Sequence, residues 1–217
     1  MLHSETVTFD LLVIAQQLCE NPQLNMFRIV GGTAISLHLG HRKSIDIDFF
    51  TCEKINKREV LLILRDMFPG TEFHITQHSI SAEIKGVRVE LFDEWHTPFL
   101  DQPVTADRLR LASLPDLAAF KLDAIIERRE KKDYIDLCVI FQTLGALPVL
   151  QLFKSYNPHV SDKSVLFALG EVEVARVNKS VMPEMLITLP WETIEHAMIN
   201  AAREFIASKN PHQEKMD

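Results

Sequence analysis

An alternation of apolar and acidic residues runs through I-D-I-D-F-F at 45–50, and this pattern constrains the fold most strongly. Side chains two residues apart on a strand share one face, about 6.5–7 Å apart, so Asp46 and Asp48 lie on one side and Ile47 and Phe49 on the other. Two neighbouring carboxylates repel unless a cation lies between them, which indicates a hard divalent metal, most simply Mg²⁺ (or Mn²⁺). An edge strand with an acidic outer face would show the same alternation.

A glycine pair precedes this strand. Residues 26–30, M-F-R-I-V, are predicted as a short buried strand, and Gly31 and Gly32 then begin a helix that closes near Gly40. A strand, two glycines and a helix start allow backbone N–H groups to approach a phosphate, and the Thr33 hydroxyl could add a donor. The cations of the loop H-R-K-S, Arg42 among them, could also meet phosphates. An ordinary strand-to-helix turn and a solvated loop are the alternatives.

A third acidic candidate lies in the segment V-R-V-E-L-F-D-E-W. Glu90 is flanked by apolar residues, as Asp46 and Asp48 are, whereas Asp93 falls at the expected strand end, where acidic residues are common. We therefore prefer Glu90 to Asp93 as the third carboxylate of a metal site.

The remaining periodicities predict an α+β fold, with the strands between 26 and 112 and mostly helix after that. Helices are predicted at 8–20, 56–67, 113–129, 132–144, 148–155, 162–169 and 191–207, and strands at 72–78, 80–85, 87–92 and 108–112. A hairpin is predicted at Lys85-Gly86, and the polar tail 208–217 is expected to fray.

Composition narrows the class of protein. The 217 residues are 47% hydrophobic and 24% charged, as in an ordinary globular protein, and the net charge of −7 argues against bulk coating of nucleic acid. No segment has the roughly 18 apolar residues of a membrane span, and the first ten residues lack a signal pattern. Three distant cysteines predict free thiols in the cytoplasm.

Several enzyme classes are disfavoured because their motifs are missing from the sequence. The chain contains no G-x-S-x-G, no P-loop, no G-x-G-x-x-G and no H-E-x-x-H. A serine hydrolase, a P-loop NTPase, a dinucleotide dehydrogenase and a zinc hydrolase are therefore not expected. His74 and His78 would share a face of a strand at 72–78, but they lack the helical context of a zinc site.

The segment G-G-T-A-I-S-L-H-L-G-H-R-K-S-I-D-I-D-F-F (31–50) resembles the AbiEii/AbiGii-type nucleotidyltransferase toxin family, within the polymerase-β-like superfamily. That family also has a downstream signature of a helical lysine, a basic stretch and D-x-x-D-L. Here it reads P-D-L-A-A-F-K-L-D-A-I-I-E-R-R-E-K-K-D-Y-I-D-L, which contains Lys121, Asp133 and Asp136. The two signatures span roughly 31–137.

The second signature has a physical interpretation of its own. Lys121 lies among apolar residues, where an ammonium needs a partner, and a phosphate would serve; a lysine that reaches solvent is the alternative. The basic run at 128–132 could guide an RNA or a triphosphate, or form a solvated helix end. Asp133 and Asp136 lie on one helical face and could position a base, a ribose or Lys121 itself.

The resemblance implies a nucleotidyltransferase-like α/β core at 1–112 with a small mixed sheet flanked by helices. Residues 113–217 would be a helical region, of which 113–145 completes the site. Asp46, Asp48 and Glu90 would hold the metal, and the triphosphate would lie against Gly31, Gly32, Thr33, Arg42 and Ser44. Lys121 would contact phosphate, with Asp133 and Asp136 in support.

The implied reaction moves an NMP from an NTP to an acceptor, which is expected to be RNA such as tRNA. The resemblance also implies a cognate antitoxin as partner and a toxin–antitoxin or abortive-infection role. Two alternatives remain open. The same fold could modify a small molecule, as antibiotic nucleotidyltransferases do, or it could be a catalytically silent binding module.

Overall fold

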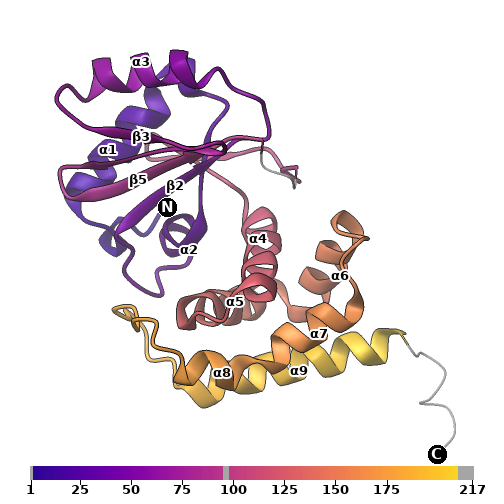
Figure 1. Cartoon of the computed structure of the whole chain (residues 1–217). Coiled ribbons are helices and arrows are strands. Elements are labelled where there is room, and N and C mark those ends of the chain that lie inside the picture. Colours follow the sequence, from indigo (N-terminus) through magenta and orange to yellow (C-terminus); the bar gives the residue numbers. More distant parts are fainter. Residues whose placement is uncertain (1, 95–97, 210–217) are drawn as a thin grey trace, which may run out of the picture. The chain divides into compact units, whose positions relative to one another are not determined.

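A computed structural model describes residues 2–94 and 98–209. The chain divides into two compact units, Met1–Leu117 and Ala118–Asp217. The first unit contains the sheet and the second is helical (Figure 1). The boundary expected from the sequence, 112/113, lies five residues earlier, at the end of the last strand. The fraying expected for the tail concerns mostly residues outside the described range.

The first unit contains three α-helices and seven strands among its described residues. They are α1 (Phe9–Glu20), β1 (Arg28–Val30), α2 (Gly31–Leu39), β2 (Asp46–Phe50), α3 (Lys57–Met67), β3 (Phe73–Ile75), β4 (Ser79–Ile84), β5 (Val87–Phe92), β6 (Val104–Ala106) and β7 (Leu109–Leu111), with 3₁₀ turns at Ser4–Thr6 and Pro22–Leu24. The predicted strands and helices are confirmed to within a few residues, except that β6 is absent from the prediction.

The strands form one mixed sheet in the order β3-β4-β5-β2-β1-β7-β6. The pairs β2–β5 and β1–β7 are parallel and the other pairs are antiparallel. The expected α+β class with a small mixed sheet is therefore confirmed. Strand β2 lies in the interior of this sheet, not at its edge, which removes the edge-strand explanation for its acidic face.

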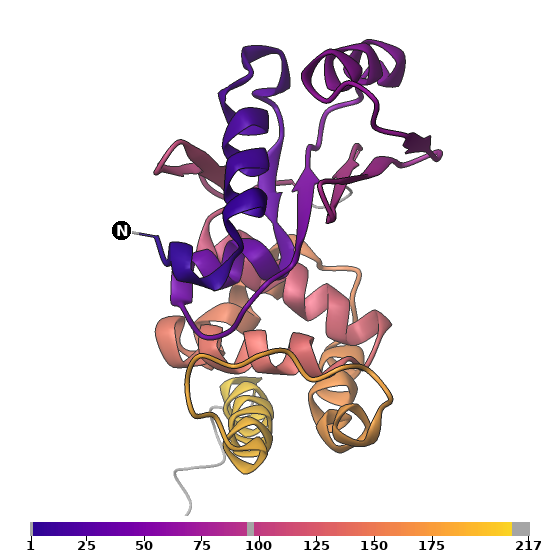
Figure 2. The ribbon, with the colours of Figure 1, turned by 90° about the vertical axis from the view of Figure 1, so that its left-hand side faces the viewer.

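The strand register divides the sheet into an apolar face and a polar face. Ile47 and Phe49 of β2 lie beside Val89 and Leu91 of β5, and all four side chains are at most 3% exposed. Helix α1 lies along the sheet and contacts β2 and β7 (Figure 2). The alternate residues of the same strands, Asp46 among them, therefore face the other side.

The hairpin between β4 and β5 turns at the predicted position. Lys85 and Gly86 both have positive φ, 50° and 79°. Two successive residues with positive φ are the geometry of the tight hairpin turn whose twist matches the strands, and glycine at the second position adopts it readily. In contrast, β3 ends at Ile75, so the expected pairing of His74 and His78 on one strand is wrong.

The second unit consists of helices. They are α4 (Leu114–Glu127, which begins in the first unit), α5 (Lys131–Leu144), α6 (Ala146–Tyr156), α7 (Asp162–Gly170), α8 (Val172–Val177) and α9 (Trp191–Lys209). Helix α9 packs against α5, α6, α7 and α8 through Ile194, Met198, Ala201 and Phe205, which recur at helical spacing and are buried. Only the short α8 is missing from the prediction.

Two further expectations concern membranes and cysteines. None of the described helices has by itself the length and apolar composition of a membrane span, and α5 with α6 reaches them only as a pair bent by 108°. All three cysteines are free thiols, with Cys19 and Cys138 buried and Cys52 exposed, as predicted.

Candidate active site

Three carboxylates meet on the polar face of the sheet. Asp46 and Asp48 are two residues apart on β2, and Asp48 lies directly opposite Glu90 on the adjacent parallel strand β5. Because residues opposite each other in register point to the same side, all three carboxylates share one face. Each is partly accessible, in contrast to the fully buried Ile47 between the two aspartates. The sequence-predicted acidic set is thus collected on one surface.

Gly31 allows the Asp48 carboxylate to lie against the start of α2. Its φ is +66°, and a Cβ at this position would fall 2.7 Å from Asp48 Oδ2. Such a contact is too short for real atoms, and the positive φ is itself unfavourable for a residue with a side chain. Glycine is therefore required here both by the backbone conformation and by the proximity of Asp48.

Gly32 creates the same kind of space for Arg42. A Cβ at Gly32 would fall 2.2 Å from Arg42 Nη2, and Arg42 is only 4% exposed. Its Nη1 donates a hydrogen bond to the Lys43 carbonyl at 2.9 Å. The α2 N-cap, Val30, makes no side-chain capping hydrogen bond, and the backbone N–H groups at a helix start are the kind of donors that bind anions. The glycine pair, Asp48 and Arg42 thus gather at one helix end.

The hydroxyls of Thr33 and Ser44 are engaged within the protein. Thr33 Oγ1 donates to the Asp46 carbonyl and lies 2.8 Å from Ser44 Oγ, and both side chains are buried. This link fastens α2 to the strand that carries Asp46. The observed contacts position the aspartate, whereas the sequence predicted that both hydroxyls would bind the triphosphate.

Glu90 accepts hydrogen bonds through both of its oxygens. Ser79 Oγ donates to Oε1 at 3.0 Å and Arg88 Nη2 donates to Oε2 at 2.8 Å. The hydrogen bond and charge of Glu90, together with the charges of Asp46 and Asp48, raise the pKa of Arg88. Sequence reasoning missed Arg88, although the alternation V-R-V-E places it two residues from Glu90 and hence on the same face.

Asp93, the alternative third carboxylate, belongs to a different environment. It follows the last residue of β5, is 4% exposed and forms an ion pair with Lys57 Nζ at 2.6 Å. Lys57 also donates to the Gln77 carbonyl at 2.8 Å. These contacts join α3 to the end of β5, so Asp93 has a structural partner away from the face that carries Glu90.

The donor chemistry of the acidic face suits a hard cation, because carboxylate oxygens are the ligands that Mg²⁺ and Mn²⁺ prefer. Among residues 2–94 and 98–209, however, no three His, Cys, Asp or Glu side chains are arranged closely enough to hold a metal ion. Both Glu90 carboxylate oxygens accept hydrogen bonds, from Ser79 and from Arg88. Asp46 and Asp48 fit the role of ligands, and Glu90 would join them only after exchanging Arg88.

The second unit holds a network of charged side chains around two buried aspartates. Lys121 Nζ lies 2.7 Å from Asp133 Oδ1 and 2.8 Å from Asp136 Oδ2, and both aspartate side chains are 0% exposed. Arg128 Nε donates to Asp133 Oδ2 at 2.8 Å. Burial alone would raise the pKa of Asp133, but the Lys121 charge and the Arg128 hydrogen bonds outweigh it and hold this pKa below its ordinary value.

This network supplies the partner that a buried Lys121 ammonium requires. The sequence left open a phosphate partner for Lys121 or a side chain that reaches solvent, and it placed Asp133 and Asp136 where they could position Lys121. The structure pairs the ammonium with both aspartates. The predicted phosphate contact of Lys121 stays a prediction.

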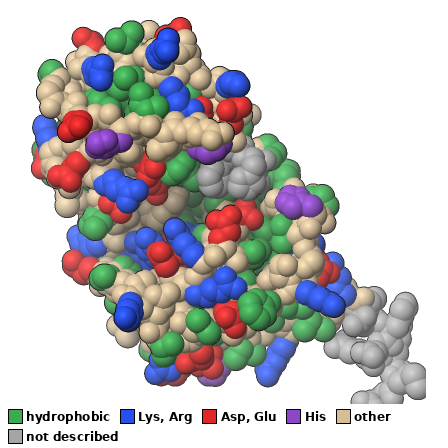
Figure 3. Space-filling model, viewed as in Figure 1, with side chains coloured by type: hydrophobic (Ala, Val, Ile, Leu, Met, Phe, Trp, Pro, Cys, Tyr) green, Lys and Arg blue, Asp and Glu red, His purple; other side chains and the backbone are tan. Residues whose placement is uncertain are grey.

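The basic run at 128–132 is also engaged inside its own unit. Arg129 donates to the Ile126 carbonyl at 3.0 Å, Lys131 donates to the Asn178 and Ser180 carbonyls, and Lys132 lies 3.2 Å from Glu130 Oε2. Acidic and basic side chains are interspersed on the visible face of the molecule (Figure 3). These contacts weaken the interpretation of this run as a guide for RNA.

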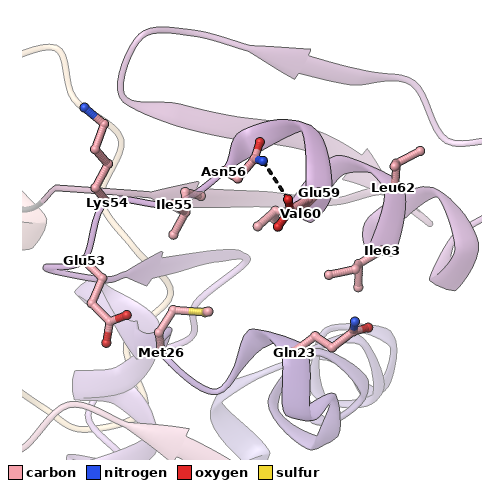
Figure 4. Close-up of a pocket in the computed structure, with 10 residues that line it drawn as sticks. All are labelled: Gln23, Met26, Glu53, Lys54, Ile55, Asn56, Glu59, Val60, Leu62 and Ile63. Atoms are coloured by element: carbon pink, nitrogen blue, oxygen red, sulfur yellow. Dashed lines mark hydrogen bonds between the residues drawn. The ribbon is translucent and has the colours of Figure 1, made fainter.

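A cavity of about 500 Å³ opens elsewhere in the first unit (Figure 4). It is lined by residues of the segment between α1 and β1, the segment after β2, and helix α3: Gln23, Met26, Glu53, Lys54, Ile55, Asn56, Glu59, Val60, Leu62 and Ile63. Its Asn56–Glu59 hydrogen bond, 2.8 Å long, lies at the start of α3. None of the sequence-predicted site residues lines this cavity, so it is separate from the acidic face.

Known structures share this architecture. JHP933 from Helicobacter pylori superimposes with a TM-score of 0.53 at 16% identity, covering 96% of each chain. ANT(2")-Ia in complex with adenylyl-2"-tobramycin gives a TM-score of 0.54 at 20% identity, covering 70% of this chain and 98% of that one. The fold is therefore that of the nucleotidyltransferases.

Sequence comparison gives a finer assignment. Residues 13–91 match the family described as nucleotidyl transferase AbiEii toxin, Type IV TA system. This match includes the glycine pair and all three carboxylates, and it confirms the expected resemblance and the nucleotidyltransferase class for that segment. An uncharacterized protein of Aquifex aeolicus is 25% identical over 190 residues, which are 84% of this chain and 89% of the relative.

Proposed function

We propose that the protein is a divalent-metal-dependent nucleotidyltransferase that moves an NMP from an NTP to a hydroxyl acceptor. The observation that carries the proposal is the gathering of Asp46, Asp48 and Glu90 on one face of the sheet, with Gly31 holding the helix start against Asp48. The match over residues 13–91 supports the same reaction class.

The reaction exchanges a phosphoanhydride bond for a phosphate ester bond. The acceptor oxygen forms a bond to the α-phosphorus, the α–β phosphoanhydride bond breaks, and pyrophosphate leaves with that electron pair. Asp46 and Asp48 would hold the metal, Mg²⁺ or Mn²⁺, with Glu90 as third ligand. When bound, the metal supplies charge stabilisation for the phosphate oxygens.

The residues around the carboxylates have defined tasks in this proposal. The backbone N–H groups at the start of α2, at Gly31 and Gly32, bind phosphate oxygens, and the Arg42 guanidinium beside Gly32 adds positive charge. Thr33 and Ser44 hold α2 and β2 in register through their hydroxyls. The hydroxyl proton of the acceptor passes to Glu90 or to solvent.

We propose RNA as the acceptor, with tRNA as the first substrate to test. We further propose a toxin–antitoxin role, a cognate antitoxin as partner and a cytoplasmic site of action. The family description, which names a toxin of a type IV TA system, supports the toxin–antitoxin role and the antitoxin partner. The RNA acceptor and the cytoplasmic site rest on the sequence resemblance. A small cationic acceptor is the second candidate. It is favoured by the internal engagement of the basic run at 128–132 and by the net charge of −7.

The two candidates are separated by one experiment. Purified protein is incubated with Mg²⁺ and each of the four α-³²P-labelled NTPs, together with total tRNA or with an aminoglycoside such as tobramycin. Label on RNA from the wild type, but not from Asp46→Asn/Asp48→Asn, supports the RNA acceptor. Label on the aminoglycoside alone supports the small cationic acceptor instead of RNA. A lack of transfer to either acceptor argues for the catalytically silent binding module.

A further inference from the structure

Arg88 lies among the carboxylates of the polar face. It is opposite Asp46 on one neighbouring strand and opposite Glu83 on the other, and it is two residues before Glu90 on its own strand. All of these residues therefore lie on the same side of the sheet. The Arg88 guanidinium thus lies on the same face as four carboxylates, those of Asp46, Asp48, Glu83 and Glu90, and lowers the repulsion among them.

The contact between Arg88 and Glu90 is close and yet easily broken. Arg88 Nη2 lies 2.8 Å from Glu90 Oε2, while the Arg88 side chain is 67% exposed and the Glu90 side chain 15%. An ion pair with one partner in solvent contributes little to stability, because water can replace that partner at low cost. Arg88 can therefore leave Glu90 without disturbing the fold.

We propose that Arg88 is a positioning residue that competes with the divalent metal for Glu90; this role rests on the proposed function. In the metal-free protein, Arg88 forms an ion pair with Glu90 and lowers the negative charge of the acidic face. Glu90 would exchange Arg88 for a metal held by Asp46 and Asp48. The side chain thereby sets the metal affinity of the nucleotide-free enzyme.

Mn²⁺ binding to the nucleotide-free protein, followed by electron paramagnetic resonance, tests this competition directly. Arg88→Gln is expected to bind Mn²⁺ about 3- to 10-fold more tightly than the wild type, since both a competitor and a positive charge are removed. Arg65→Gln, which removes an exposed charge from α3, controls for bulk electrostatics and should change the affinity less than about twofold. Arg88→Lys, which keeps the charge, should fall between the wild type and Arg88→Gln.

The Glu90→Gln background separates competition for Glu90 from a general charge effect. Arg88→Gln should tighten Mn²⁺ binding much less there than in the wild type, because the contested ligand is gone. An equal effect in both backgrounds, an effect no larger than that of Arg65→Gln, or weaker binding by Arg88→Gln would overturn the proposal. If neither the wild type nor Arg88→Gln binds Mn²⁺, the metal dependence of the proposed function fails as well; if Mn²⁺ binds equally to both, only the role of Arg88 fails.

Discussion

The Asp48 carboxylate occupies the space that a side chain at Gly31 would take: a Cβ at residue 31 would fall 2.7 Å from Asp48 Oδ2. The acidic pair of β2 and the start of α2 are therefore fitted to each other, and the space between them exists only because residue 31 is glycine. A change at this position should affect the placement of Asp48 as well as the backbone.

Gly31→Ala is expected to destabilise the protein by about 2–4 kcal/mol, the sum of a strained positive φ and a displaced carboxylate. Gly70→Ala is the matched control. Gly70 also has a positive φ, +83°, but no atom beyond its chain neighbours lies within 4 Å of the position that a Cβ would take. This control should therefore cost only about 1–2 kcal/mol. Urea unfolding measures both, and equal losses would show that the proximity of Asp48 is unimportant.

Thr33→Val removes the hydroxyl that joins α2 to the Asp46 carbonyl. The loss of a buried hydrogen bond is expected to cost about 1–2 kcal/mol in the free energy of unfolding. Thr33→Ser keeps the hydroxyl and should lose less than Thr33→Val. Thermal or urea unfolding of the two variants decides the point. If Thr33→Ser is the more destabilised, the methyl group rather than the hydroxyl matters at this position.

Lys121→Met leaves the carboxylates of Asp133 and Asp136 without the ammonium between them. An uncompensated buried charge is expected to destabilise the protein by about 3–5 kcal/mol. Lys132→Met is the matched control, since Lys132 is 43% exposed and pairs with Glu130; it should cost less than about 1 kcal/mol. Similar losses in the two variants would contradict the account of the buried network.

The network also predicts a dependence of stability on pH. The pKa of Asp133 is held below its ordinary value by Lys121 and Arg128 against the effect of burial. A carboxyl with a lower pKa in the folded state adds stability above its unfolded pKa, about 3.9, and this stability is lost as the pH falls through the folded value.

The stability difference between the wild type and Asp133→Asn should therefore be constant from pH 7 down to about 5 and shrink towards pH 2. Urea unfolding across this range measures it. A difference that stays the same at every pH would show that Asp133 does not titrate with a lowered pKa.

The acidic face was predictable because it rests on short-range patterns. Alternation in β2 and β5 identifies which residues share a face, and the glycine pair marks the adjoining turn. The partners of the basic run were not predictable, because Lys131 contacts Asn178 and Ser180, which lie about 50 residues further along the chain. The pairing of Arg88 with Glu90 follows from the same alternation, but its importance emerges only once β2 is known to lie beside β5.

The shortest elements escaped prediction for a related reason. Strand β6 and helix α8 contain 3 and 6 residues. Such segments are too short to show a period, and tertiary pairing decides their conformation: β6 is defined by its pairing with β7.

Asp46 and Asp48 are proposed to support metal-dependent nucleotidyl transfer. Transfer of label from α-³²P-NTP to the acceptor in the presence of Mg²⁺ tests this role most directly. Asp48→Asn is compared with Asp66→Asn, which neutralises an exposed carboxylate of α3. We expect Asp48→Asn to retain its folded stability and lose at least about 100-fold in rate, with Asp66→Asn unchanged. Transfer by Asp48→Asn at the wild-type rate would contradict the claim.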